Sequence, residues 1–320
     1  MFGRVPHEVG RSRASRRRLC GTAGRPSGIR EDALSLDALY ELIPRILPLE
    51  CLKARFMQQA LVGLLLLAPM AAAMGVQVVN FRMAFFSDAI SHSAFAGVAL
   101  GLLAAVDPRW TMPAFALLVG LGIVMLQRRT TLSSDTIIGV CFSAVIAFGL
   151  AVVSRDRSVT RDLQRFLYGD ILTIGDTEIL CLGGLFVVLM LFQFWGYNRM
   201  LYIGLNPALA QAHRVRVAFY QYAFAALLSL VVIFAVWAVG VLLVTALLIV
   251  PAAAARNFSH SAGGMFWWAL LIGVASAVTG LLVSAQDWAC TATGATIVLV
   301  AFGWFVLSAA VALLRGERVA

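Results

Sequence analysis

The sequence predicts an all-α membrane protein, a polytopic bundle of about eight or nine transmembrane helices. Of its 320 residues, 61% are hydrophobic and only 13% are charged, whereas a soluble domain of ordinary composition carries about 25% charged residues. A water-soluble fold of this size cannot hide so much apolar surface. Most of the chain is therefore expected to face lipid.

Long stretches without an acidic or basic residue fill the chain from Phe56 onward. They cover residues 56–81, 89–106, 110–127, 136–154, 179–198, 217–255, 257–286 and 288–314. About 20 apolar residues cross the hydrocarbon layer as a helix. The stretch 217–255 would be about 58 Å long as one helix, so we expect two spans that separate near 238–240. This gives nine candidate segments.

The first fifty residues differ from the rest. Eight arginines lie between Arg4 and Arg30 against one acid, Glu8, and the Gly, Pro and Ser segment 21–28 is typical of disorder. We therefore divide the chain into two parts. Residues 1–50 form a basic, disordered extension plus a short interfacial helix, and residues 51–320 form the transmembrane domain.

Three function classes are disfavoured by composition. The formal charge of +9 comes largely from the N-terminal extension, and no basic stripe is interleaved with aromatics, so nucleic acid is not an expected partner. The five cysteines include no C-x-x-C pair, which argues against a disulfide framework or a thiolate metal site. The single lysine, Lys53, follows Leu52, so the chain has no phosphate-binding loop of its own and is not expected to be an enzyme.

The arginines predict how the helices are oriented in the membrane. The loop 199–216 holds three arginines and no acid, so it is placed on the cytoplasmic side together with the C-terminal end. Nine full crossings would then put the basic N-terminus outside, against the rule. We therefore expect that 89–106 or 110–127 does not cross fully, which leaves eight spans and both ends inside.

Asp88 and His92 are the residues with most chemical meaning in the apolar half of the chain. They stand four apart in Met83-Ala-Phe-Phe-Ser-Asp-Ala-Ile-Ser-His-Ser-Ala-Phe-Ala-Gly97 and share one helix face. Ionisable groups at membrane depth are usually functional. A carboxylate with an imidazole suits Zn²⁺, Mn²⁺ or Fe²⁺, whereas Ca²⁺ and Mg²⁺ prefer oxygen ligands. The alternative is that Asp88 caps the helix and His92 bonds to a neighbouring helix.

The segment 82–97 resembles a signature of the zinc, manganese and iron ABC-importer permeases, the membrane subunits of zinc-uptake type. Further stretches fit this family in the same order, and the resemblance covers roughly residues 52–314. The further stretches that fit are Asp135–Ser143, Phe166–Leu172, Val239–Arg256 and Thr293–Leu299. The resemblance implies an ABC-importer permease fold and a metal site at Asp88 and His92. Ser87 and Ala96 depart from the usual Gly and Pro.

The same resemblance implies a function and a set of partners. The chain would be a multi-pass permease of the inner membrane that imports Zn²⁺, Mn²⁺ or Fe²⁺, with no permanently bound cofactor. Its partners would be a cytoplasmic ATP-binding subunit, an extracytoplasmic metal-binding protein, and a second permease copy or a paralogue. Membrane lipid would surround it.

The loop from Leu201 to Val215 resembles the short cytoplasmic helix that docks on the ATPase. Asn206 followed by Pro207 is a good cap and first position for that helix. The coupling residues implied are Asn206, Pro207, Ala208, Ala212 and His213, although the family commonly has acids near 206–208 and Gly at 213.

Four other interpretations remain open. The acids of the outer loop, Asp156, Asp162, Asp170, Asp176 and Glu178, could attract cations or form a solvated loop. The chain could be an ABC permease for a chelated cargo of siderophore or cobalamin type. An intramembrane metalloenzyme is less favoured because no H-E-x-x-H motif is present. A secondary transporter should show inverted repeats or several intramembrane charges, and neither is clear in this sequence.

Overall fold

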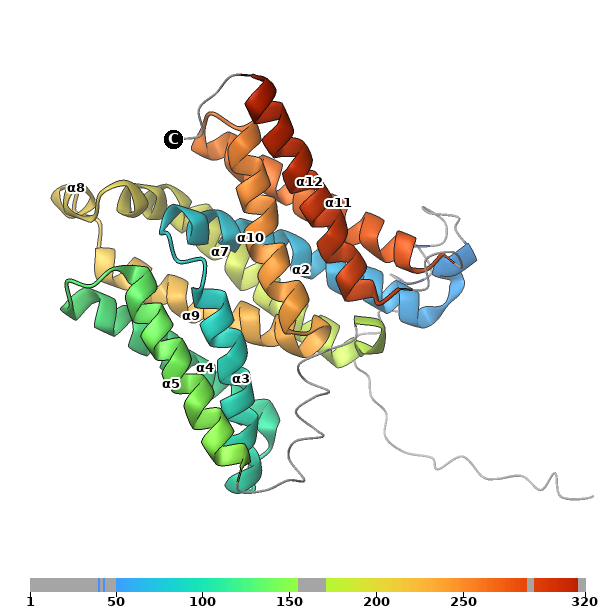
Figure 1. Ribbon diagram of the computed structural model, residues 1–320, viewed down its shortest axis with the longest axis horizontal. Helices are drawn as coiled ribbons and strands as arrows, with labels where there is room; N and C mark the ends of the chain where they lie inside the picture. Colours follow the sequence, from blue (N-terminus) through green and yellow to red (C-terminus); the bar gives the residue numbers. More distant parts are fainter. Residues whose placement is uncertain (1–39, 41–42, 44–49, 155–170, 287–290, 316–320) are drawn as a thin grey trace, which may run out of the picture. The chain divides into compact units, whose positions relative to one another are not determined.

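The computed structural model describes residues 40, 43, 50–154, 171–286 and 291–315, and every regular element in these ranges is a helix (Figure 1). The predicted all-α class is therefore confirmed. Nearly all of the predicted extension, apart from residues 40, 43 and 50, lies outside the described residues. The elements in chain order are η1 (Glu50–Lys53), α2 (Arg55–Asn80), α3 (Phe86–Leu103), α4 (Pro108–Arg129), α5 (Ser134–Val153), η2 (Ile171–Thr173), α7 (Asp176–Leu205), α8 (Pro207–Ala212), α9 (Val217–Val239), α10 (Val241–Phe258), α11 (Ala262–Ser284) and α12 (Thr293–Leu314).

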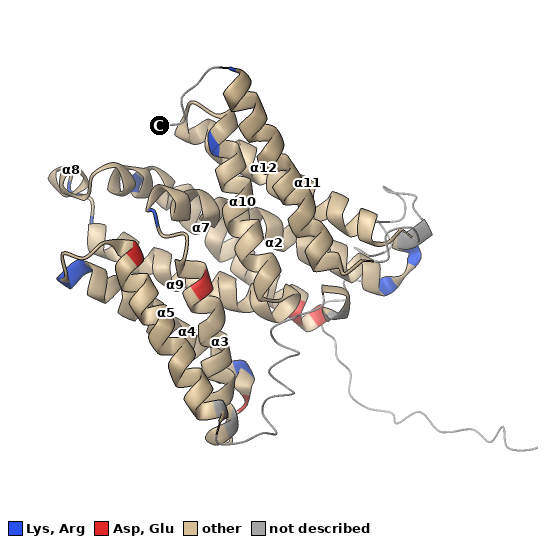
Figure 2. Cartoon of the chain, in the orientation of Figure 1, with Lys and Arg blue, Asp and Glu red and all other residues tan. Residues whose placement is uncertain are grey.

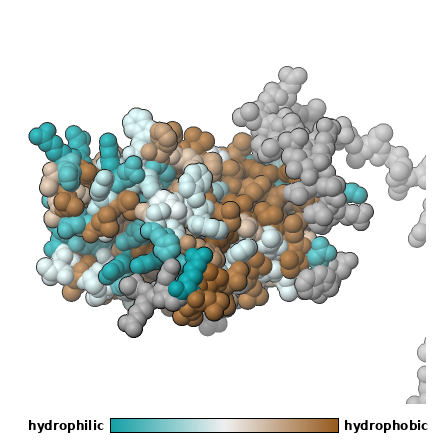
Figure 3. Space-filling view, turned by 90° about the horizontal axis from the view of Figure 1, so that it is seen from above, coloured by the Kyte–Doolittle hydropathy of each residue, from teal (hydrophilic) through white to brown (hydrophobic). Residues whose placement is uncertain are grey.

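Eight of the described helices are long and apolar enough to cross a membrane: α2, α4, α5, α7, α9, α10, α11 and α12. Many large apolar side chains are exposed on them. Figure 3 shows this hydrophobic surface, with hydrophilic residues gathered toward the end that carries α8 in Figure 1. Apolar surface on this scale is stable against lipid rather than water. The predicted polytopic transmembrane bundle is confirmed.

The long apolar stretch 217–255 turns at Gly240. Helix α9 ends at Val239 and α10 begins at Val241, so one residue separates the two helices. Gly240 has a φ of 85°, a conformation that glycine adopts readily because it has no Cβ. The expected break between two spans near 238–240 is confirmed.

Helix α3 has 18 residues, and it begins beside the middle of its neighbour α4 rather than beside the end of α4. The two helices are antiparallel: a Cβ atom on Gly97 of α3 would lie 2.9 Å from the Cα atom of Met112 near the start of α4. A Cβ atom on Gly120 would lie 3.3 Å from the ring of Phe86, the first residue of α3. From Gly120, α4 continues to Arg129, about 14 Å further at the usual helical rise. Helix α3 therefore spans only part of the distance that α4 spans.

Contacts at both ends of α2 show that it runs in the same direction as α7. Near the start of α2, the Gln59 Nε2 atom donates to Oδ1 of Asp176, the first residue of α7, at 2.9 Å. At the other end, Asn80 and Phe81 lie against Gly204 in the last turn of α7.

The last helix, α12, ends on the side where α2 ends. The Asn257 Nδ2 atom near the end of α10 donates to Ser308 Oγ near the end of α12 at 3.0 Å. Ala255 of α10 lies in one buried cluster with Val76 of α2. The start of α2 and the end of α12 are therefore at opposite ends of the helix bundle. The expectation that both ends lie inside is wrong for these helices, because the segment 81–85 and α3 together return the chain to the side where α2 starts.

Helix α2 is the most deeply buried of the eight spans. It approaches α10 very closely, because a Cβ atom on Gly75 would lie only 1.8 Å from the carbonyl oxygen of Leu248. Helix α11 is also close, since a Cβ atom on Gly273 would lie 3.1 Å from the Ala72 Cβ atom. Close backbone approach at small residues is the usual way in which membrane helices pack.

We predict that Gly75→Ala destabilises the protein, because the new methyl group would overlap the backbone of Leu248 and force α2 and α10 apart. Overpacking of this kind costs about 1–3 kcal/mol. The apparent melting temperature of the purified protein in detergent measures the effect. Gly184→Ala is the matched control, since a Cβ atom there would have nothing within 4 Å. Equal melting temperatures for the two variants would contradict the close contact.

Candidate metal site and docking helix

A non-helical segment, residues 81–85, determines where α3 begins. Helix α2 ends in a Schellman motif, in which the Met83 N–H donates to Val78 O at 3.0 Å and the Arg82 N–H donates to Val79 O at 3.1 Å. Arg82 has a φ of 54°, in the left-handed region that favours glycine. A non-glycine residue there holds roughly 1–2 kcal/mol of strain. The motif satisfies the last carbonyls of α2 and turns the chain toward α3.

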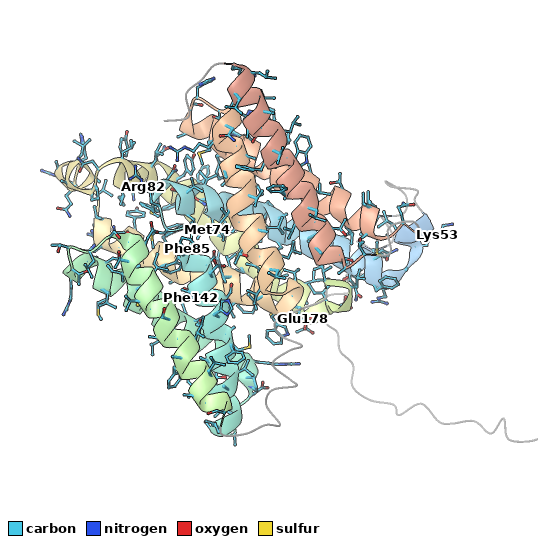
Figure 4. The ribbon with its side chains drawn as sticks, in the orientation of Figure 1. Lys53, Met74, Arg82, Phe85, Phe142 and Glu178 are labelled. Atoms are coloured by element: carbon cyan, nitrogen blue, oxygen red, sulfur yellow. The ribbon has the colours of Figure 1, made fainter. Side chains whose placement is uncertain are left out.

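Asp88 and His92 lie in the first turns of α3, and each is half-buried. Phe85, just before the helix, is 62% exposed. The His92 ring meets the Phe142 ring of α5 edge to face, with centroids 5.2 Å apart. Figure 4 labels Phe85 and Phe142 beside the start of α3. The structure thus brings the two predicted ligands together on one partly open helix face, as the sequence spacing predicts.

The two ionisable side chains lie deep among the apolar helices. Asp88 is at the level of Gly120, because a Cβ atom on Gly120 would contact both Phe86 and Ile90, which flank Asp88. This level is about 14 Å from the end of α4, near the middle of a hydrocarbon layer about 30 Å thick. Figure 2 shows most other charged residues near helix ends, and an acidic residue in the first turn of α3.

The capping alternative for Asp88 is not supported by the local hydrogen bonds. Within the described parts of the chain, neither the Asp88 carboxylate nor the His92 ring makes a hydrogen bond. The nearby side-chain bond of this turn comes from Ser87, whose Oγ atom donates to Ala84 O at 3.2 Å. Both groups are therefore able to accept a ligand without breaking a hydrogen bond within the described residues.

The described residues of a single chain do not form a complete set of metal ligands. The residues with described positions contain no group of three or more His, Cys, Asp or Glu side chains that could hold an ion. Zinc sites usually have three or four protein ligands, so a two-ligand site needs water or another chain to complete it. Such a site holds a cation weakly and releases it easily.

The acids at the start of α7 have structural partners. Asp176 accepts hydrogen bonds from Tyr40 Oη at 2.7 Å, Gln59 Nε2 at 2.9 Å and Arg55 Nη2 at 3.4 Å. Burial and the adjacent Asp176 carboxylate raise the pKa of Tyr40 above its ordinary value. Glu178 accepts from the backbone of the residue that caps α7. The cation-attracting interpretation is therefore not favoured for these two acids. The other three, Asp156, Asp162 and Asp170, lie outside the described residues.

Helix α8 starts directly after α7, with Asn206 as the only residue between them. The Asn206 N–H donates to Tyr202 O at 3.1 Å and so caps the end of α7. Its Oδ1 atom accepts from Ala208 N at 2.9 Å and from Leu209 N at 3.3 Å, and so caps the start of α8. Pro207 occupies the first helical position. The predicted cap and proline start are confirmed.

The residues named as coupling residues form an exposed surface at this end of the bundle. Asn206, Pro207, Ala208, Ala212 and His213 are all exposed. After α8, Arg214 takes a left-handed φ of 59° in a second Schellman motif, in which Val215 N donates to Ala210 O at 3.0 Å.

Arginines of other helices lie toward the same end of the bundle as α8. Nη1 of Arg128, in the last turn of α4, donates to Gln221 Oε1 at 2.8 Å, and Arg199 bonds to Tyr220. The α8 end is thus both exposed and basic.

Two contacts were not foreseen from the sequence. Phe142 lies within the motif 135–143, but nothing in the motif shows that its ring meets His92. Tyr40 lies in the predicted N-terminal part, residues 1–50, and its bond to Asp176 joins residues 136 positions apart. Sequence periodicity carries no signal for either contact, because both depend on how distant helices pack.

The sequence pattern of the ABC 3 transport family matches residues 53–312. The chain belongs to this family. The match spans α2 to α12, so the described transmembrane helices are an ABC 3 membrane domain.

The chain is similar to proteins whose names state a role in metal uptake. The high-affinity zinc uptake system membrane protein ZnuB of Haemophilus influenzae is 34% identical over 252 residues, which are 78% of this chain and 95% of the relative. The manganese import system permease protein ScaB of Streptococcus gordonii is 32% identical over 253 residues, or 79% of this chain and 90% of the relative. By name, the first is a membrane protein of a zinc uptake system and the second is a permease of a manganese import system.

Solved structures share the fold. The chain is similar to PsaBC from Streptococcus pneumoniae in complex with Fab, with a TM-score of 0.69 and 29% identity, covering 85% of this chain and 95% of that one. A metal-chelate type ABC transporter in an inward-facing conformation has a TM-score of 0.62 at 16% identity, covering 78% and 84%. The second likeness concerns the fold alone. The predicted ABC-importer permease fold is confirmed.

We predict that Asn206→Ala loosens α8, because the amide groups of Ala208 and Leu209 lose their acceptor. Loss of an N-cap costs about 1 kcal/mol. Hydrogen exchange of the α8 amides should become faster. Asn206→Asp, which keeps the acceptor oxygen, should exchange like the wild-type protein. Unchanged protection in Asn206→Ala would show that the cap does not hold α8 in place.

Proposed function

We propose that this chain is the membrane-spanning permease subunit of an ABC importer that moves a divalent transition metal ion into the cytoplasm. The observation that carries the proposal is the pair Asp88 and His92, half-buried and without hydrogen-bond partners among the described residues, near mid-depth of an ABC 3 membrane domain. Charged and ionisable groups at this depth are costly and usually mark an ion pathway.

The chemistry of the pair favours a bare ion over a chelated one. A carboxylate oxygen and an imidazole nitrogen are ligands for Zn²⁺, Mn²⁺ and Fe²⁺. A chelated cargo of siderophore or cobalamin type already has its coordination positions filled, so it does not need protein ligands at mid-depth. The relatives named for zinc and for manganese are nearly equally similar to this chain. The proposal is therefore a metal class rather than one metal.

The energy for transport comes from a partner subunit in this proposal. The one lysine of the chain, Lys53, does not stand in a phosphate-binding motif. The exposed helix α8 and its basic surroundings offer a docking surface for a cytoplasmic ATPase, with Asn206, Pro207, Ala208, Ala212 and His213 as contact residues. The opposite end, where α2 and α7 begin, would then face the extracytoplasmic metal-binding protein.

A second permease copy would complete the metal site. The exposed face of α5 carries small residues at helical spacing, Gly139, Ser143 and Ala147, and a Cβ atom on Gly139 would meet nothing within 4 Å. Such a stripe allows close helix contact. It lies on the helix whose Phe142 packs against His92. Two copies packed through α5 about a two-fold axis would bring two ligand pairs together.

We predict that Ser143→Cys cross-links two copies, because the stripe on α5 would meet its own symmetry mate. The chain for this test has its native cysteines replaced by alanine, and a short bifunctional thiol reagent is applied to membranes. Val187→Cys on α7, also strongly exposed at 57%, is the matched control and should stay monomeric. Cross-linking at Val187 with none at Ser143 would place the second copy elsewhere.

We predict that Asp88→Asn and His92→Ala each abolish uptake of the transported metal while the protein still inserts. Asn keeps the size of Asp but removes the charge that offsets a divalent cation in a medium of low dielectric constant. Mutation of a side chain that only hydrogen-bonds to a metal ligand typically lowers metal affinity or activity roughly 10- to 100-fold. Loss of a ligand itself should therefore lower metal uptake at least about tenfold. Radiometal uptake, normalised to the amount of protein in the membrane, measures it.

Asp107→Asn is the matched control for Asp88→Asn. Asp107 caps α4, and its Oδ1 atom accepts from Arg109 N at 2.9 Å, a bond that Asn can also accept. This variant should transport normally. If Asp88→Asn behaves like Asp107→Asn, and His92→Ala also transports, the pair is not the metal site.

A further inference from the structure

The Phe81 ring sits where three helices meet. Phe81 is the C-cap residue that directly follows α2. Its ring packs against the Phe224 ring of α9, with centroids 5.5 Å apart and planes at 55°. On another side it covers Gly204 of α7, because a Cβ atom built there would lie 3.7 Å from the Phe81 ring. A larger side chain at position 204 would displace the ring.

Gly204 is firmly connected to the docking helix. It lies in the last turn of α7, and only Asn206 separates α7 from α8. Asn206 bonds to both helices, through its N–H to α7 and through its side chain to α8. With both helix ends capped by one residue, α8 cannot shift without moving the last turn of α7 and hence Gly204.

Phe81 is connected just as directly to the ligand pair. The Schellman motif at Arg82 and Met83 fixes the chain after Phe81. The Phe86 N–H then donates to Met83 O at 3.0 Å, and the Phe86 side chain is completely buried. Asp88 follows in the same helical turn. A shift of the Phe81 ring therefore reaches the first turn of α3 through a short, bonded segment.

We propose that the contact between Phe81 and Gly204 transmits movement of α8 to Asp88 and His92, so that ATPase action at α8 alters the metal site. Closely packed protein interiors have low compressibility, so a displaced side chain moves the side chains that it contacts. Phe81 and Gly204 are then positioning residues for transport and touch neither metal nor ATPase. The proposal rests on the proposed function of the chain as a metal permease.

The test uses the full chain, purified with its ATP-binding subunit and reconstituted into liposomes with the metal-binding protein. The variants are Phe81→Ala, which removes the ring, and Gly204→Leu, which pushes against it. Two controls match them. Gly204→Ala places its methyl group at ordinary contact distance, and Gly184→Leu adds the same side chain to α7 at a position with nothing within 4 Å. ATP hydrolysis and the number of Zn²⁺, Mn²⁺ or Fe²⁺ ions moved per ATP are measured.

Phe81→Ala and Gly204→Leu should keep the ATPase subunit bound and hydrolysing ATP, but should move roughly tenfold fewer ions per ATP, within the range usual for coupling between two sites. Both controls should behave like the wild-type complex. Because both changes act on one contact, the double variant should lose no more than the worse single variant, whereas independent effects would add. If Phe81→Ala lowers the protein level, Phe81→Leu replaces it, since leucine keeps the apolar contact but not the ring.

Three results would overturn the proposal. Unchanged ions per ATP in both variants would show that the contact transmits nothing. Loss of the ATPase subunit on purification would make Phe81 a docking or folding residue instead. Additive losses in the double variant would show two unrelated effects. A wild-type complex that moves none of the three metals would instead refute the proposed function, whereas a wild-type complex that transports and variants that do not differ from it would refute the contact alone.

Discussion

The bilayer core contains no water, and this constraint determines most of the structure. Backbone N–H and C=O groups that meet lipid need partners within the chain, so the described spans are helices. A break in a helix inside the membrane is stable only where its own hydrogen bonds replace the helical ones. The segment 81–85 meets this condition through the Schellman bonds at Arg82 and Met83. Because the break begins α3 well inside the membrane, the first turn of α3 carries Asp88 to mid-depth.

Sequence reasoning recovers those features that depend on local chemistry. Hydropathy locates the spans, because about 20 apolar residues are needed for each crossing. The break at Gly240 and the cap at Asn206 are visible because each needs a particular residue type. The spacing of Asp88 and His92 places them on one helix face, since helical geometry repeats every 3.6 residues.

Features that depend on packing between distant helices could not be predicted in this way. The late start of α3 depends on a turn centred on Arg82, and a left-handed turn with arginine in place of glycine has no clear signature. Counting arginines also gave the wrong relation between the two ends of the bundle, because the rule weighs loops and does not see a short helix that begins below the surface. The contact of Phe142 with His92 requires knowledge of how α5 packs on α3.

The single-residue turn at Gly240 has a consequence for how the two helices that it joins are held in the membrane. Helices α9 and α10 are joined with no polar loop between them, and residues 217–255 contain no charged side chain. Neither helix end at this turn has a hydrophilic anchor to hold it at the membrane surface. The depth of this turn in the bilayer is therefore set by the helices on which the two pack, α9 mainly on α4 and α10 mainly on α12 and α2.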